Sequence, residues 1–202
     1  MTLNVALTGN IAAGKSAVSQ LFRSWGATII DTDRLAREAQ RPGGPVLAAI
    51  AARFGADVVA TGGTLDRALL RRRVMGDPVE LAALNAIVHP EVRRRLDELF
   101  REAVARGDAI VVTDIPLLFE AADPAAYDVV VLVDAPESVR RARLIGERSL
   151  SAAEADAMIA SQMPSEQKRA RSDYVIDNAG SRAALEQAAR DVWSALQTDR
   201  SQ

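Results

Sequence analysis

Cysteine is missing from this chain of 202 residues, and histidine occurs only once, as His89. The absence of cysteine excludes disulfides, zinc sites built on thiolates and cysteine nucleophiles. A single histidine does not bind a metal by itself. Before Pro90, at an expected helix junction, it is as often a cap or a packing residue as a ligand. We therefore expect neither thiol chemistry nor a metal site built on histidine.

Long apolar runs are missing as well. No segment approaches the ~18 uncharged apolar residues of a membrane span, and a glycine-containing loop interrupts the first apolar run. The chain also lacks a basic stretch followed by a long apolar one at its start, so we expect no signal peptide. The formal net charge of −2 gives no overall attraction to nucleic acid or to anionic membranes. These absences predict a soluble, cytoplasmic protein with no nucleic-acid or membrane partner.

The composition is that of a globular protein, with 49% hydrophobic and 26% charged residues. A chain of this length buries one good core and has room for a smaller appended subdomain.

The most informative stretch is LNVALTGNIAAGKSA near the start of the chain. Leu3–Thr8 is a short apolar run that ends at Gly9, as a buried parallel strand does, and the residues after Lys15 fit an amphipathic helix. Gly9 and Gly14 let successive N–H groups point into one concavity, to which the helix adds its positive dipole end. Lys15 can then reach the β- and γ-phosphates of a nucleotide, and the Ser16 hydroxyl can ligate Mg²⁺. This spacing predicts a polyphosphate site.

Aspartates follow several other expected strands. Ala27–Ile30 leads to Asp31 and Asp33, and Ala109–Thr113 leads to Asp114. Because ligands of open α/β sheets bind beyond the carboxyl ends of the strands, these side chains should lie near the phosphate loop. One of the first pair, or Thr32 between them, can instead cap the next helix. Asp114 is placed to hold Mg²⁺ directly or through water, or to act as a simple cap.

The remaining strands are expected at Asp128–Val133, which ends at Asp134, and at Tyr174–Ile176. Together the pattern predicts an α/β fold, a P-loop three-layer sandwich with a five-stranded parallel sheet. We expect one domain, whose core is residues 1–40, 107–139 and 172–202.

Two helical segments interrupt this core. Residues 41–106 read as a substrate-binding insertion, with helices expected at Val46–Phe54, Leu65–Met75, Val79–Val88 and Glu91–Ala105. Its arginine triplets, 71–73 and 93–95, form either a solvated helix face or a site for anionic groups. Residues 140–171 carry grouped cations on short helices, which suit either a mobile lid over transferring phosphate or a solvated hairpin.

Taken together, these stretches resemble the dephospho-CoA kinase family over nearly the whole chain. The resemblance rests on TGNIAAGKS, DTDRLAREAQRPGGPVL, LDRALLRRRV, LNAIVHPEVR, DIPLLFE and SQMPSEQKRARSDYVIDNAGS, in that order. The glycine loop alone marks only a superfamily, whereas the later motifs are far more specific. The family transfers a phosphate from ATP to the ribose 3′-hydroxyl, an alcohol group, of dephospho-CoA, with Mg²⁺ as cofactor.

The resemblance implies roles for individual residues. Gly9, Asn10, Ile11, Ala12, Ala13, Gly14, Lys15, Ser16 and Ala17 would bind the ATP phosphates, with Asn178 and Gly180 at the adenine. Lys15, Asp33 and Arg148 would be catalytic, with Asp33 as general base and Asp31 as the alternative. Asp31, Asp33, His89, Arg93 and Leu117 would bind the acceptor, and Ser16 and Asp114 the metal. The expected partners are ATP and dephospho-CoA, and the expected state is a monomer or a weak homo-oligomer.

The chain departs from the family pattern at three places. Asn10 and Ala12 stand where the family has glycine, which predicts a stiffer loop with weaker tuning but retained binding. The lid run RARLIGERSLS lacks the Arg-Asp-Gly order that is usual in the family, and Arg148 holds the place of that arginine within one residue. The alternative is a kinase of the nucleoside monophosphate kinase type. Its acceptor is a phosphate that needs no base, so the Asp31 and Asp33 pair argues against it.

Overall fold

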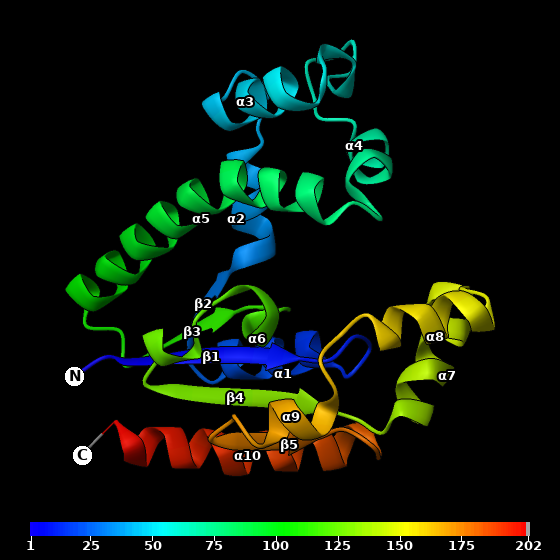
Figure 1. Ribbon diagram of the computed structural model, residues 1–202. Coiled ribbons are helices and arrows are strands. Elements are labelled where there is room, and N and C mark those ends of the chain that lie inside the picture. Colours follow the sequence, from blue (N-terminus) through cyan, green and yellow to red (C-terminus); the bar gives the residue numbers. More distant parts are fainter. Residues whose placement is uncertain (201–202) are drawn as a thin grey trace. The chain divides into compact units, whose positions relative to one another are not determined.

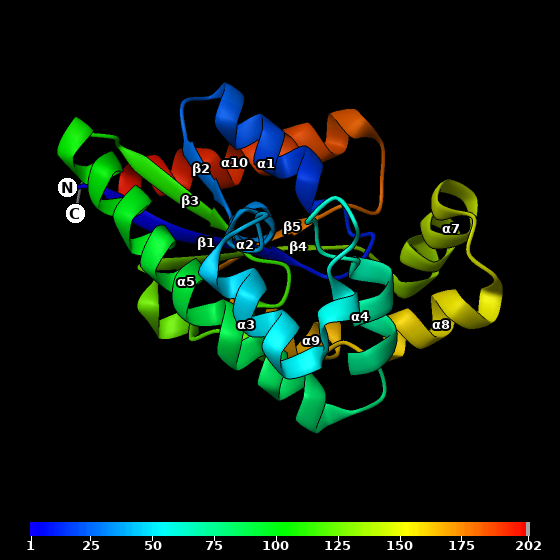
Figure 2. The ribbon, with the colours of Figure 1, turned by 90° about the horizontal axis from the view of Figure 1, so that it is seen from above.

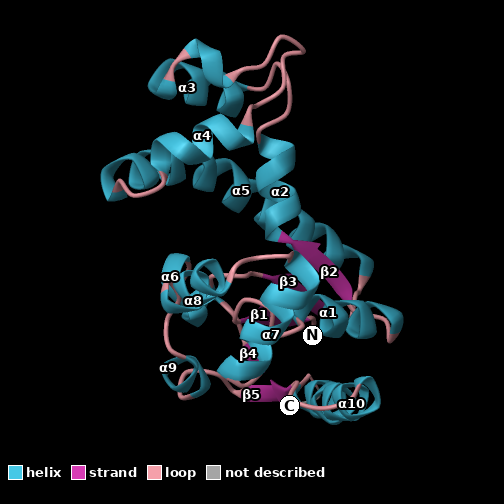
Figure 3. Cartoon of the chain, turned by 90° about the vertical axis from the view of Figure 1, so that its right-hand side faces the viewer, coloured by secondary structure: helices cyan, strands magenta, loops and turns pink. Residues whose placement is uncertain are grey.

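The computed structural model describes residues 1–200 and divides into two compact units. The first contains residues 1–31 and the chain from Glu102 onward, and the second is Thr32–Arg101. All strands of the described residues lie in the first unit, whereas the second is helical apart from one bridge between Val59 and Leu65 (Figure 3). The insertion predicted at residues 41–106 overlaps most of the second unit, which also takes in the helix that follows Asp31.

The first unit is built on a five-stranded sheet in the order β2-β3-β1-β4-β5 (Figure 1). Its strands are β1 (Leu3–Gly9), β2 (Thr28–Asp31), β3 (Ile110–Asp114), β4 (Val129–Asp134) and β5 (Tyr174–Asp177). All four pairings are parallel. The two strands on either side of β1, namely β3 and β4, are buried along their whole length, which explains their continuous apolar sequence. The predicted parallel sheet is confirmed.

Helices cover both faces of this sheet and give three layers. On one face α1 (Lys15–Ser24) and α10 (Arg182–Asp199) lie side by side (Figure 2). The Phe22 and Trp193 rings meet there with their centroids 5.5 Å apart. On the other face α6 (Leu118–Ala121) and Met163 pack against Ala6 and Val130. α9 (Ser165–Arg169) contacts β4.

The expected lid, residues 140–171, contains α8 (Ala152–Ala160), α9 and most of α7 (Glu137–Arg148), of which α7 and α8 pack on each other (Figure 1). Leu144 and Ile159 form their buried contact, and Ile11 of the phosphate loop packs against it. Ser151 and Glu154 make a reciprocal capping box at the start of α8. A short helix, η2 (Pro124–Ala126), precedes β4.

The second unit has its own apolar core. Its helices are α2 (Thr32–Ala39), α3 (Pro45–Phe54), η1 (Ala56–Val58), α4 (Arg67–Val74) and α5 (Pro78–Arg106), the last turns of which belong to the first unit. Ile50, Phe54 and Leu70 are buried against Val88 of α5. The predicted α3 and α4 are confirmed within two residues.

The predicted break at His89 and Pro90 is wrong, because α5 runs unbroken from Pro78 to Arg106. A proline inside a helix lacks one N–H and costs about 3 kcal/mol. Leu84, Ile87 and Val92 pack on one core on both sides of this point, and that packing outweighs the local loss. Within residues 1–200 no helix combines the length and apolarity that crossing a membrane requires.

Candidate active site

The loop between β1 and α1 has the shape that its glycines allow. A Cβ on Gly9 would lie 2.7 Å from the carbonyl oxygen of Val133, so only glycine lets this strand end approach β4. Gly14 caps α1 with φ 95° and ψ 20°, a left-handed conformation. The first amide N–H groups of an α-helix lack acceptors one turn earlier and therefore favour anions. In α1 the Ala17 N–H donates instead to the Gly14 carbonyl at 3.0 Å. The loop therefore has a phosphate-binding form.

Ala12 also adopts a left-handed conformation, with φ 58°. For a residue with a Cβ this conformation costs about 1–2 kcal/mol. Ala12 is one of the two positions at which the resemblance described above led us to expect glycine, which adopts this conformation without strain.

Three charged residues lie at the edge of the sheet formed by the carboxyl ends of its strands, and two of them are in direct contact. The Lys15 ammonium forms an ion pair with the Asp114 carboxylate, and both side chains are largely buried, with 16% and 11% exposed. Asp31 lies beside Asp114 in the register of β2 and β3. This arrangement follows from the topology, because parallel strands that end together bring their terminal residues to one edge. It brings together three residues for which we predicted a role.

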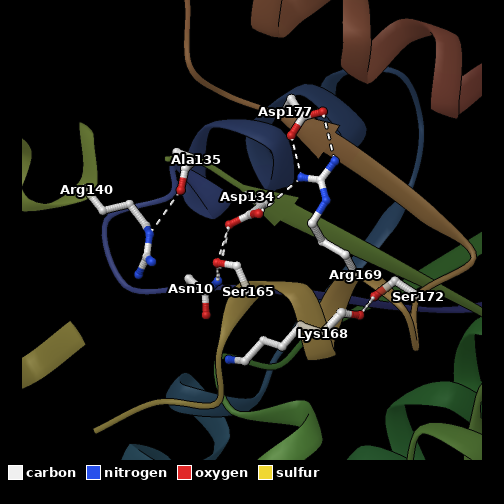
Figure 4. A network of polar contacts seen from close by, with 9 residues as sticks. All are labelled: Asn10, Asp134, Ala135, Arg140, Ser165, Lys168, Arg169, Ser172 and Asp177. Atoms are coloured by element: carbon white, nitrogen blue, oxygen red, sulfur yellow. Dashed lines mark hydrogen bonds and ion pairs between the residues drawn. The ribbon is translucent and has the colours of Figure 1, made fainter. Parts of the chain in front are cut away.

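Asn10, the other position at which we expected glycine, is buried and takes part in a polar network (Figure 4). Its side-chain amide donates to Ser165 Oγ at 2.7 Å and to Asp134 Oδ1 at 3.2 Å. Arg169 donates to Asp134 and to Asp177, and these two carboxylates raise the pKa of its guanidinium. Asn10 thus fastens the phosphate loop to β4 and to α9.

Ile11 and Ala13 are held from outside the loop. The Ile11 N–H donates to Gln162 Oε1 at 2.8 Å, and the Asn178 side chain donates to the Ala13 carbonyl at 2.8 Å. Asn178 is buried, whereas Gly180 is exposed two residues later. Ser16 and Ala17, in the first turn of α1, are exposed. Asn178 is thus in direct contact with the phosphate loop.

Arg143 on α7 also contacts this neighbourhood, and sequence reasoning did not select it as a site residue. Its guanidinium donates to the Ala12 carbonyl and to the Asn178 carbonyl, both at 3.0 Å. Arg148, the lid arginine that we selected, is the last residue of α7 and is exposed. Helical spacing could have identified Arg143 from the sequence. It lies one turn after Val139, and so on the side of α7 that faces the loop.

Asp33, His89 and Arg93 belong to the second unit. Asp33 lies in the first turn of α2 and is exposed, and His89 and Arg93 are one helical turn apart on α5. Partial burial, and then the positive charge of Arg93, lower the pKa of His89 below 6.5, so the ring is neutral at pH 7. With twelve arginines and nine acidic residues, the second unit has a formal net charge of +3. Its charge suits an anionic ligand.

The first unit offers a limited set of oxygen ligands to a cation. No group of three or more acidic or histidine side chains suited to a metal ion occurs among residues 1–200. Mg²⁺ in nucleotide sites needs only one or two protein oxygens, because waters and substrate phosphates supply the rest. The exposed Ser16 hydroxyl and the Asp114 carboxylate, beside Asp31, fit that requirement.

Known proteins resemble this chain over most of its length. The family model for dephospho-CoA kinase matches residues 3–184. A dephospho-CoA kinase from Streptomyces avermitilis is 46% identical over 194 residues, which are 96% of this chain and 94% of that protein.

Solved structures give the same result for the fold. A crystal structure from Thermus thermophilus matches with a TM-score of 0.80 and 39% identity, covering 96% of this chain and 98% of the other. Dephospho-CoA kinase from Campylobacter jejuni matches with a TM-score of 0.75 and 24% identity, covering 98% and 99%. The expected P-loop kinase fold is thereby confirmed. The chain belongs to the dephospho-CoA kinase family.

Proposed function

We propose that this chain transfers the γ-phosphate of ATP to the ribose 3′-hydroxyl of dephospho-CoA, giving coenzyme A and ADP. The observation that carries the proposal is the meeting of Lys15 and Asp114 beside Asp31, at the mouth of a phosphate loop. Family membership gives the acceptor. The alternative, a kinase of the nucleoside monophosphate type, loses support because the family match covers residues 3–184.

The ATP phosphates would occupy the loop from Gly9 to Ala17. Their oxygens would accept hydrogen bonds from the N–H groups at the start of α1 and would draw the Lys15 ammonium toward the β- and γ-phosphates. Buried phosphate charge in a fixed cradle of donors is the main source of acceleration in phosphoryl transfer. The adenine would lie near Asn178 and Gly180, next to Arg143.

Mg²⁺ would be held by Ser16 and Asp114, and when bound it neutralises charge on the β- and γ-phosphate oxygens. Asp114 gains a second function in this proposal. Its carboxylate compensates the Lys15 ammonium within the protein, and phosphate oxygens offer that ammonium a more highly charged anion. Lys15 would therefore exchange partners when ATP binds.

The acceptor hydroxyl needs a base, and we propose Asp33 for this role, with Asp31 as its neighbour and alternative. General base catalysis by a positioned carboxylate contributes about 10²–10⁴-fold. His89, Arg93 and Leu117 would contact dephospho-CoA. Neutral His89 can donate or accept one hydrogen bond, and the net positive charge of its unit suits the diphosphate of the acceptor. Arg148 would reach the transferring phosphate from the lid.

The proposal has a cellular side as well. Because ATP is held inside cells, we propose a cytoplasmic location. A monomer or a weak homo-oligomer suffices, since one chain carries every residue named above.

An acceptor panel tests the proposal. The purified protein with Mg-ATP is offered dephospho-CoA, AMP, CMP or shikimate, and ADP release is followed in a coupled assay. We expect ADP release with dephospho-CoA alone. ADP release with AMP or CMP would instead support a kinase of the nucleoside monophosphate kinase type. No ADP release with any acceptor would refute the kinase activity itself. The Lys15→Met variant, assayed in parallel, controls for contaminating kinases.

A further inference from the structure

A fully buried lysine lies outside the proposed machinery. Lys168 on α9 has 0% of its side chain exposed, and its Nζ lies 2.8 Å from Glu120 Oε1. The contact has the distance of an ion pair, and no directed hydrogen bond to the ammonium accompanies it within residues 1–200. Taking an ammonium group out of water is unfavourable unless an anion compensates it. Lys168 therefore depends on Glu120 for its place in the fold.

The neighbouring side chain shows that this burial is specific. Figure 4 shows Lys168 and Arg169 leaving α9 in different directions, with Arg169 reaching Asp134 and Asp177. Lys168 points away from both of these carboxylates. The two consecutive cations therefore have different partners: Arg169 binds aspartates at the ends of β4 and β5, and Lys168 contacts Glu120 on α6.

Glu120 receives two contacts from the segment that joins α8 to β5. Besides Lys168, the Met163 N–H donates to Glu120 Oε1 at 3.1 Å. Arg171 adds a third link to α6, with its guanidinium carbon 4.9 Å from the centre of the Phe119 ring. The segment therefore fixes the C-terminal side of the loop that follows Asp114.

This loop carries Leu117, which is 42% exposed, whereas its neighbours Leu118 and Phe119 are buried. At its start the Ile115 N–H donates to the Leu7 carbonyl at 2.9 Å, which joins it to the sheet. At its end the anchor is Glu120. The position of the exposed Leu117 side chain is therefore set by the contacts of both Ile115 and Glu120.

The same segment also holds the phosphate loop, through Gln162 to the Ile11 N–H and through Ser165 to Asn10. It contacts the ATP-binding loop at one end and the loop of Leu117 at the other. We propose that Lys168 and Glu120 are positioning residues for the acceptor: their buried ion pair sets Leu117 against dephospho-CoA. The inference rests on the proposed function, since Leu117 contacts the acceptor only in that reaction.

Steady-state kinetics of Lys168→Met test the inference. Methionine keeps the unbranched chain and removes the charge, and it leaves Glu120, which is 22% exposed, within reach of water. We expect KM for dephospho-CoA to rise roughly 3- to 30-fold, the range for residues that act through others. KM for ATP should stay within about twofold of wild type, because the phosphate loop keeps its own contacts. Lys168→Arg, which keeps the charge, should restore KM for dephospho-CoA.

Glu120→Asp is the second variant. It keeps a carboxylate for the buried ammonium, so the protein folds, but it withdraws that carboxylate by one methylene. We expect the same selective rise in KM for dephospho-CoA. Arg190→Met on α10 is the matched control, because it replaces an exposed cation by the same side chain on the opposite face of the sheet from α6, where Arg190 contacts Glu186 and the Trp25 ring. Its kinetic constants should equal those of the wild type.

The outcomes separate the inference from the proposed function. A wild-type enzyme without turnover on dephospho-CoA refutes both. If the wild type is active and the Lys168 and Glu120 variants have the same KM for dephospho-CoA as the wild type, the proposed function is kept and the inference is overturned. A parallel rise in both KM values, or a lower melting temperature with unchanged KM values, overturns it as well, because either result shows a purely structural role.

Discussion

Replacing Gly14 by alanine tests the description of the phosphate loop. Alanine at φ 95° is strained by about 1–3 kcal/mol. Its Cβ would also lie 2.2 Å from Asn178 Nδ2, so the Asn178 side chain must move. That movement breaks its 2.8 Å hydrogen bond to the Ala13 carbonyl and leaves buried polar groups unpaired, which costs about 1–3 kcal/mol. The two effects together predict a loss of about 2–6 kcal/mol of unfolding free energy.

For a chain of this size each kcal/mol shifts the melting temperature by about 2–4 °C. We therefore expect Gly14→Ala to melt roughly 4–24 °C below the wild type in circular dichroism, with weakened ATP binding. Gly146→Ala on α7 is the matched control, because a Cβ there meets no atom within 4 Å. It should stabilise the protein by about 0.5–1 kcal/mol, as alanine does inside helices.

The collision with Asn178 has its own test in a double-mutant cycle. In an Asn178→Ala background the Gly14→Ala change should cost only the backbone strain, about 1–3 kcal/mol. Equal costs in both backgrounds would refute the collision, and an unchanged melting temperature in the single Gly14→Ala variant would refute the whole description of the loop.

Three further predictions concern the proposed chemistry and the second unit. Lys15→Met should lower kcat at least ~100-fold, because it removes a fixed cation from the transferring phosphate; a kcat near that of the wild type would exclude Lys15 from the reaction. Asp33→Asn should retain ATP binding, measured by calorimetry, and slow transfer at least ~100-fold; unchanged turnover would move the base to Asp31. The pKa of His89 is lower in the folded chain than in the unfolded one, so the unfolded state binds more protons and stability should fall as the pH drops below about 6.5. Urea unfolding across pH 5–7 measures this, and the loss should shrink in His89→Gln; an equal loss in that variant would contradict the assignment.

The sequence was most informative at the ends of the strands. Buried parallel strands have continuous apolar sequences, so β3 and β4 were visible as uninterrupted runs, and the topology of parallel sheets required their terminal aspartates to share one edge. The neighbourhood of Lys15, Asp31 and Asp114 follows from these rules. The structure adds which side chains form the pair, since Lys15 contacts Asp114 directly.

Long-range packing was harder to predict. Local rules place a helix end at Pro90, and only the core of the second unit, which continues past it, explains an unbroken α5. Arg143 is distinguished from the other arginines of α7 by the side of the helix that it occupies, and its partners Ala12 and Asn178 lie 131 and 35 positions away along the chain. The same holds for Asn10, whose partners Asp134 and Ser165 lie far along the chain.

The most direct test of the proposed reaction is the identity of its product. Mg-ATP and dephospho-CoA are incubated with the purified protein, and the products are quantified by chromatography and located by phosphorus NMR. The account predicts one ADP for each dephospho-CoA consumed, and a new phosphate monoester on the ribose 3′-oxygen. A phosphate at any other position, or ADP release that does not depend on dephospho-CoA, would contradict it.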